Sequence, residues 1–196
     1  DGVSFVIGMK AYIGTGYTTN NGIYYKDFWE WDQSTNAWTA KADFPGGPRS
    51  GAIAFSIGNK GYIGLGADGS TLYKDFWEYD SLSNTWLKRA NFGGTARSYA
   101  SSFTIGTNGY VGIGSNAGNF FKDVWTWDKI SDTWTSITEF GGGRRSHAVG
   151  FSISGKGYIG TGLGKNDVWF NDLWEYTPNV NPGQTNCVDF ESPILP

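Results

Sequence analysis

The sequence predicts an all-β protein built from four copies of one antiparallel unit of four short strands. Similar phrases recur every 48 to 50 residues, and the composition combines 30 Gly with 10 Trp, 11 Tyr and 13 Phe. No segment carries ten or more residues of helical periodicity. A glycine content far above the ~7% of ordinary domains, together with so many aromatic residues, indicates tight turns between buried strands and excludes a disordered chain.

Two phrases mark each copy of the repeat. The first is a tyrosine-containing segment that ends in Gly-x-Gly, and its tyrosines are Tyr12, Tyr62, Tyr110 and Tyr158. The second is Lys-Asp-Phe-Trp-Glu-Tyr-Asp and its variants, whose tryptophans are Trp29, Trp77, Trp125 and Trp174. Nine residues later a further tryptophan recurs at positions 38, 86 and 134, and position 183 of the fourth copy is glycine instead. A fixed period of this length is typical of repeat architectures.

The second copy illustrates the expected strands. The first strand lies within 51–57, and a Gly58-Asn59 turn leads into the second, 61–65. A variable loop precedes the third strand, 73–79, and a turn rich in Asp, Ser and Asn, 80–84, precedes the fourth, which begins at Trp86. The third strand places Phe76 beside Trp77. Because neighbouring residues on a strand point to opposite faces, both faces should be buried, as in sheets stacked radially around a channel.

These residues resemble the kelch repeat of β-propellers, in particular galactose-oxidase-like kelch proteins of bacteria. The likeness covers 1–177, although this chain has Gly-x-Gly where the family usually has adjacent glycines. It implies a propeller with blades at about 1–49, 50–97, 98–145 and 146–177, followed by a degenerate last strand or C-terminal linker at 178–196. Four blades are fewer than the six or seven that the resemblance implies. We therefore expect an incomplete ring, or one closed by further blades or a second chain; a compact four-bladed ring remains an alternative.

Charge and composition narrow the possible functions. A net charge of −3 with 17% charged residues provides no basic field for a nucleic-acid backbone, so we expect no nucleic-acid partner. No run approaches the ~20 apolar residues of a membrane span, so we expect no membrane insertion. The lone Cys187 excludes an internal disulfide and a site with several thiolates. Gly64 to Gly69 match a dinucleotide fingerprint but lie between two strands, where no helix would follow.

The sequence predicts no catalytic residue, no metal site and no cofactor. A copper site like that of galactose oxidase requires two histidines, and the chain has only His147. The repeated carboxylates are interpreted as structural partners of the arginines that link the blades, with a ring of carboxylates around a ligand or cation as the alternative; they are Asp27, Asp75, Asp123 and Asp172. Catalysis needs residues that break the repeat. The few polar residues that do so are Asp68, Glu139, Arg144, His147, Lys165 and Asp167.

Binding is expected at the loops between second and third strands and at the links between blades, which emerge on one face of a propeller. The candidate binding residues are Tyr17, Asn20, Asn21, Arg49, Arg97, Asn116, Asn119, Arg144, Arg145, His147 and Trp169. Aromatic and arginine side chains are enriched at binding hot spots. The expected function is noncatalytic recognition of a protein or glycan, and the resemblance implies an extracellular or cell-surface location. The alternatives are part of a carbohydrate oxidase or isomerase with active residues in other blades, and a structural part of a surface assembly.

Overall fold

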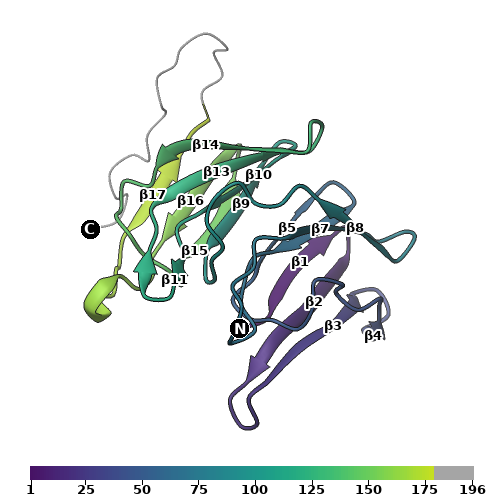
Figure 1. The fold of residues 1–196 in the computed structure, drawn as a ribbon. Helices are drawn as coiled ribbons and strands as arrows, with labels where there is room; N and C mark the ends of the chain where they lie inside the picture. Colours follow the sequence, from purple (N-terminus) through teal and green to yellow (C-terminus); the bar gives the residue numbers. More distant parts are fainter. Residues whose placement is uncertain (179–196) are drawn as a thin grey trace. The chain divides into compact units, whose positions relative to one another are not determined.

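The computed structural model describes residues 1–178, which fall into two compact units that meet in the sequence between Ser98 and Tyr99. The predicted all-β fold with four kelch-type blades is confirmed, because every main strand ladder is antiparallel and stays within one repeat (Figure 1). No described ladder joins two blades, so strand pairing does not close a ring within residues 1–178. No helix in this part of the chain is long and apolar enough to span a membrane.

The first unit holds blades 1 and 2, each a four-stranded sheet with its strands in sequence order. Blade 1 consists of β1 (Val3–Ile7), β2 (Lys10–Thr18), β3 (Ile23–Asp32) and β4 (Ala37–Ala40). Blade 2 consists of β5 (Ile53–Ile57), β6 (Lys60–Gly64), β7 (Phe76–Asp80) and β8 (Thr85–Arg89). The third strand of blade 2 is shorter than the expected 73–79. Leu65 (φ 61°) and Gly66 (φ 88°) turn the chain out of the ladder directly after β6.

The second unit holds blades 3 and 4. Blade 3 consists of β9 (Ser101–Ile105), β10 (Asn108–Gly112), β13 (Asp123–Asp128) and β14 (Thr133–Glu139), with a small ribbon, β11 (Ser115–Asn116) and β12 (Asn119–Phe120), between β10 and β13. Blade 4 consists of β15 (Val149–Ile153), β16 (Lys156–Gly160) and β17 (Leu173–Tyr176), with the 3₁₀ turn η1 (Lys165–Asp167) between β16 and β17. The expected final segment, 178–196, lies outside the described residues from 179 onward.

Aromatic side chains fill the space between the blades of each unit. In the first unit, Phe28 of blade 1 meets Tyr79 and Trp86 of blade 2 edge-on, with ring centroids 4.8 and 5.0 Å apart. Phe5 lies over Gly61 of β6 so closely that a methyl group on this glycine would overlap the ring. Phe103 of β9 covers Gly157 of β16 in the same way in the second unit. Blade packing therefore depends on a phenylalanine in one blade and a glycine in the next.

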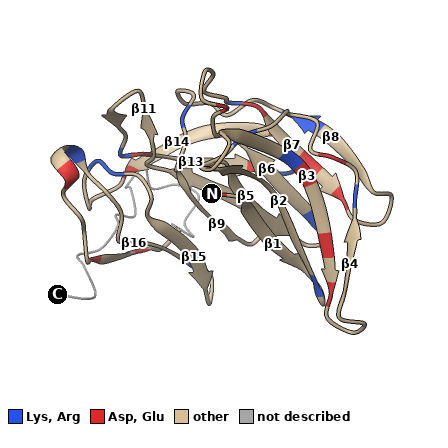
Figure 2. Ribbon diagram, turned by 90° about the horizontal axis from the view of Figure 1, so that it is seen from below, with Lys and Arg blue, Asp and Glu red and all other residues tan. Residues whose placement is uncertain are grey.

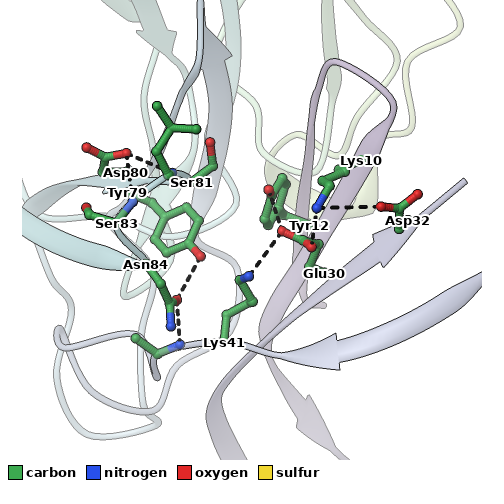
Figure 3. A network of polar contacts seen from close by, with 12 residues as sticks. Lys10, Tyr12, Glu30, Asp32, Lys41, Tyr79, Asp80, Ser81, Ser83 and Asn84 are labelled. Atoms are coloured by element: carbon green, nitrogen blue, oxygen red, sulfur yellow. Dashed lines mark hydrogen bonds and ion pairs between the residues drawn. The ribbon is translucent and has the colours of Figure 1, made fainter. Parts of the chain in front are cut away.

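Side-chain hydrogen bonds hold the predicted turn between the third and fourth strands. Asp80 accepts the backbone N–H of Leu82 at 2.9 Å, and Lys60 donates to its other oxygen at 2.5 Å. The Lys60 bond, followed by the backbone bonds, lowers the pKa of Asp80 to about 2. Asn84, at φ 54°, accepts the Tyr79 hydroxyl at 2.8 Å and the N–H of Ala42 at 3.0 Å. Asn84 thus fixes its own turn and attaches it to blade 1 (Figure 3).

A buried carboxylate network crosses the strands of blade 1 (Figure 3). Glu30 accepts the Tyr12 hydroxyl at 2.7 Å and Lys10 Nζ at 2.7 Å, and it pairs with Lys41 at 3.3 Å. Burial favours the neutral acid, but the hydrogen bonds from Lys10, Tyr12 and Lys41 outweigh it, so the pKa of Glu30 is lowered. Burial, together with the bond to Glu30, raises the pKa of Tyr12 well above its usual value. Glu30 is therefore a structural anion of the blade.

Candidate functional site: the loop pocket of the second unit

Arg49, on the link between blades 1 and 2, is completely buried. Its guanidinium donates to both carboxylate oxygens of Asp75, at 2.6 and 3.1 Å, and to the carbonyl of Leu65 at 2.8 Å. The group also lies over the Tyr73 ring, 4.0 Å from its centroid. Two parallel N–H···O bonds of this kind give a strong and directional pair. Arg49 consequently ties the link to the loop that precedes β7.

Arg145 repeats this arrangement in the second unit. It is buried, pairs with both oxygens of Asp172, donates to the carbonyl of Thr161 at 2.9 Å and lies 3.7 Å from the centroid of the Phe170 ring. Burial opposes ionisation of Asp172, but the bond from Arg145 prevails and the pKa of this carboxyl is lowered. The predicted pairing of repeated carboxylates with linking arginines is confirmed at Asp75 and Asp172. Arg97 is also completely buried, so none of these three candidate arginines offers its guanidinium to a partner.

His147 lies at the start of blade 4 and stacks on Tyr99, with ring centroids 3.9 Å apart. Both residues have positive φ, 57° and 54°, as does Gly51 (60°) at the equivalent point of blade 2. His147 Nδ1 lies 2.9 Å from the Ser146 hydroxyl. Although the residue is exposed, partial desolvation lowers the pKa of its imidazole. Left-handed backbone at Tyr99 and His147 is energetically costly, and it keeps the two rings in contact.

Three other candidate residues belong to the β2–β3 hairpin of the first unit, Tyr17 near the end of β2 and Asn20 and Asn21 in the turn that follows. Tyr17 is half-buried against Tyr24, with ring centroids 4.6 Å apart. Asn20 and Asn21 are exposed, and Asn21 accepts a hydrogen bond from the Thr18 hydroxyl. This loop belongs to a different unit from Asn116, Asn119, Arg144, His147 and Trp169. The predicted binding residues are therefore divided between the two units.

An open pocket of about 280 Å³ lies in the second unit, where three loop segments meet. The β11–β12 ribbon contributes Gly118 to Phe121, the link between blades contributes Arg144, and the β16–β17 loop contributes Lys165. The ribbon turns tightly because Ala117 (φ 46°) and Gly118 (φ 85°) both adopt positive φ, as two-residue hairpin turns require. This turn brings Asn119 and two phenylalanines to the pocket wall.

The pocket is cationic and partly aromatic. Arg144 and Lys165 are exposed, and Arg144 donates to the carbonyl of Phe120 at 3.0 Å. Lys165 belongs to η1, whose next residues, Asn166 and Asp167, have positive φ. The η1 turn carries both basic and acidic residues (Figure 2), but none of the pocket-lining residues within 1–178 is a carboxylate. Two cations beside apolar rings can bind an anionic group attached to an apolar one.

The pocket contains only two of the candidate residues, Asn119 and Arg144. Asn116 is on β11, and Trp169, 72% exposed, follows η1; neither lines the pocket. Sequence reasoning left Lys165 out of the binding set, although its departure from the repeat was a usable signal. Within residues 1–178, no group of three or more His, Cys, Asp or Glu side chains could hold a metal ion.

Comparison with known proteins identifies the family. The family model described as the KLHDC2/KLHL20/DRC7 Kelch-repeats domain matches residues 3–182, and the chain therefore belongs to the kelch-repeat β-propellers. No curated protein matches it. The solved structure of YjhT is similar, with a TM-score of 0.74 and 19% identity over 95% of this chain. The chain spans 66% of YjhT. At this identity the likeness shows the fold alone.

Proposed function

We propose that this chain is a noncatalytic kelch interaction module whose loop pocket binds a protein segment carrying an acidic side chain beside an apolar one. The observation that carries the proposal is the meeting of Arg144 and Lys165 with Phe120 and Phe121 in one open pocket, where no described lining residue is a carboxylate. Complementary charge would speed encounter and fix the register of the partner. The aromatic walls would supply apolar contact area.

The composition of the pocket favours a peptide over a neutral glycan. A sugar offers many hydroxyl groups, and a site for it needs many matched hydrogen-bond groups. Among the lining residues that the structure describes, Asn119 is the only one with a side-chain amide. A peptide with a carboxylate and an apolar side chain would use both the cations and the rings of the wall. Kelch propellers are generally protein-interaction scaffolds, which supports the same choice. A bacterial cell-surface location remains a prediction from the sequence.

The experiment is selection from a random peptide display library with the purified chain as bait. The variants Arg144→Ala and Lys165→Ala then measure the role of each cation for a selected peptide. The matched control is Lys129→Ala in the turn between β13 and β14, at the opposite end of β13 from the pocket. Because one lost charge contact of about 1.4 kcal/mol changes Kd tenfold, each pocket variant should weaken binding by about tenfold. The control variant should bind within twofold of the original chain.

Three outcomes would overturn this proposal. Selected peptides that tolerate both pocket substitutions would place the binding surface elsewhere. A glycan array whose hits depend on Arg144 and Lys165, with no peptide selected, would assign the pocket to an acidic sugar instead. Measured turnover of a sugar by this chain would favour the enzyme alternative.

A further inference from the structure

The chain contains two Asn-Gly pairs, Asn21-Gly22 and Asn108-Gly109. In such a pair the glycine nitrogen can attack the side-chain amide carbon of the preceding asparagine, because glycine has no β-carbon to obstruct the approach and leaves the backbone free to rotate. The structure places the two pairs in opposite surroundings. The first lies in a hairpin turn (Figure 1), and the second lies in a strand that is paired on both sides.

The Asn21-Gly22 pair belongs to the turn 19–22 between β2 and β3. Gly22 has φ 68°, and apart from its chain neighbours no atom lies within 4 Å of the position that a β-carbon would occupy. The Gly22 N–H donates to the carbonyl of Thr18 at 3.1 Å. Rotation of this peptide toward the Asn21 side chain therefore breaks that hydrogen bond but displaces no side chain packed on Gly22.

Thr18 also contacts the side chain that would react. Its hydroxyl donates a hydrogen bond to Oδ1 of Asn21. When the Gly22 nitrogen adds to the amide carbon, negative charge develops on this oxygen, and a donor already aimed at the oxygen stabilises the charge. The turn thus combines an unobstructed nucleophile with a polarised amide.

The Asn108-Gly109 pair is held in the sheet of blade 3. Asn108 pairs with Ile105 of β9 and Asp128 of β13, and Gly109, which is buried, pairs with Thr104 and Trp127. Rotation of the Gly109 peptide requires the ladder to open on both sides, and such local opening of a core strand costs far more free energy than the opening of a loop. The second pair is therefore an internal control with the same two residues.

We propose that Asn21 is a site of spontaneous deamidation in the folded protein. The Gly22 nitrogen loses its proton and bonds to Cγ of Asn21, and the bond from Cγ to Nδ2 breaks, so that the side-chain nitrogen leaves with a proton as ammonia. Water then opens the resulting succinimide ring at either of its carbonyl groups. The products are aspartate or isoaspartate at position 21, without any change in oxidation state.

The modification would change the charge and the backbone of a predicted binding region. Both products place a carboxylate in the turn, and isoaspartate also adds a carbon atom to the main chain. Asn21 is a candidate binding residue, and the same hairpin carries the candidates Tyr17 and Asn20. The proposal does not depend on the loop pocket, which belongs to the second unit.

The test is peptide mapping of residues 1–196 during incubation at neutral pH. Trypsin releases residue 21 in the peptide 11–26 and residue 108 in the peptide 98–122. Fragmentation in the mass spectrometer locates the mass increase that accompanies replacement of the amide by a carboxylate, and methylation by an isoaspartyl methyltransferase measures isoaspartate. We expect deamidation at Asn21 to be at least about tenfold faster than at Asn108, because opening of the β10 ladder adds to the barrier at the second site.

Substitutions in the turn test the roles of its residues. Thr18→Val removes the donor to Oδ1 and should slow deamidation at position 21 about tenfold, the lower end of what a hydrogen bond to a charged group contributes. Thr18→Ser should restore the original rate, and Gly22→Ala should slow the reaction because its methyl group obstructs the nitrogen.

The isolated peptide 11–26 provides the reference for an unstructured chain. Equal rates at positions 21 and 108 in the folded protein would overturn the proposal. Conversion of the isolated peptide without conversion of position 21 in the folded protein would also overturn it, because the turn would then protect the asparagine. Faster deamidation in Thr18→Val than in the original chain would overturn the role of Thr18, since its hydroxyl would then restrain the amide.

Discussion

The buried pair of Arg49 and Asp75 should contribute far more to stability than a surface ion pair of the same chain. Arg49→Met keeps most of the side-chain volume between Phe44 and Tyr73 but removes both bonds to Asp75. The Asp75 side chain is 16% exposed, so its charge would remain largely desolvated and without its cation. Breaking a buried pair in this way costs about 3 to 5 kcal/mol. Partial solvent access to Asp75 places the expected loss near the lower end, about 3 kcal/mol.

A double-mutant cycle separates the pair from the effects of the single substitutions. The unfolding of Arg49→Met, Asp75→Asn and the double variant in urea is followed by tryptophan fluorescence. Stabilities are compared only among variants whose denaturant dependence (m-value) is unchanged, because a shift of the unfolding midpoint then reports a change in stability. Bonds between charged groups are worth about 1.5 to 3 kcal/mol each, and we expect a coupling energy of about 2 to 3 kcal/mol. Asn at position 75 retains an oxygen for the indole N–H of Trp77, which donates to Asp75 at 2.8 Å.

The control cycle uses an exposed ion pair of blade 1. Lys26 and Asp43 lie 3.3 Å apart with side chains 52% and 55% exposed, and such pairs contribute about 0 to 1 kcal/mol. Lys26→Met and Asp43→Asn should therefore show a coupling energy below about 0.5 kcal/mol. If both cycles give the same coupling, burial does not strengthen the arginine pair, and its assignment as the fixed attachment of the link is refuted.

Three further substitutions or conditions test the packing and the networks by urea unfolding. Gly61→Ala should lower the free energy of unfolding by about 1 to 3 kcal/mol because the added methyl group overlaps Phe5. The control, Gly58→Ala, has φ 62° but open space around it and should cost only about 1 kcal/mol. Equal costs would contradict the blade-packing argument. Asn84→Ala should cost about 1 to 3 kcal/mol because it removes two accepted hydrogen bonds and places alanine at positive φ. Asn84→Gly removes the same bonds but tolerates positive φ, so it should cost less. A larger loss for Asn84→Gly than for Asn84→Ala would exclude backbone strain. The pKa of Glu30 is lower in the folded protein than in the unfolded chain. The ionised Glu30 therefore contributes its full stabilisation of the folded state above the unfolded-chain pKa of about 4.3. This contribution is lost as the pH falls through the folded-state pKa. Glu30→Gln should reduce this loss between about pH 5 and 3, and an unchanged pH profile would exclude Glu30 as its source.

The repeat made the fold predictable from sequence. Phrases of fixed spacing located the strands and turns, and the turn 80–84 forms as expected because Asp80 and Asn84 bond to the local backbone and side chains. The late start of the third strand, β7, was not predictable. It results from Leu65, a non-glycine residue with φ 61° between two glycines, and left-handed backbone at leucine has no clear sequence signal.

The binding residues were less predictable, because sequence position does not give burial. An arginine in a link between blades is compatible both with a binding hot spot on the surface and with a buried ion pair. The hydrogen bonds of Arg49 to Asp75 and of Arg145 to Asp172 assign these two arginines to the second role. The pocket required three loops from distant parts of the sequence to meet. Lys165 acquires its significance from the side chains of Asn119 and Arg144 beside it, and no spacing rule relates these positions.

Blade 3 shows which departures from the repeat are structural. Blade 2 combines Tyr62, Glu78 and Arg89, with Glu78 accepting the tyrosine hydroxyl at 3.0 Å and Arg89 Nη2 at 2.6 Å. Blade 3 keeps the tyrosine but has Thr126 and Ile137 at the other two positions.

The acid and its cation are thus replaced together in blade 3, as expected when either alone would leave a buried charge unpaired. Ile137 packs on the apolar cluster between blades 3 and 4 instead. A departure that is compensated within its own blade needs no partner outside it. Arg144 and Lys165 break the repeat without such a compensating ion pair within residues 1–178, and for this reason the search for a ligand should begin with their pocket.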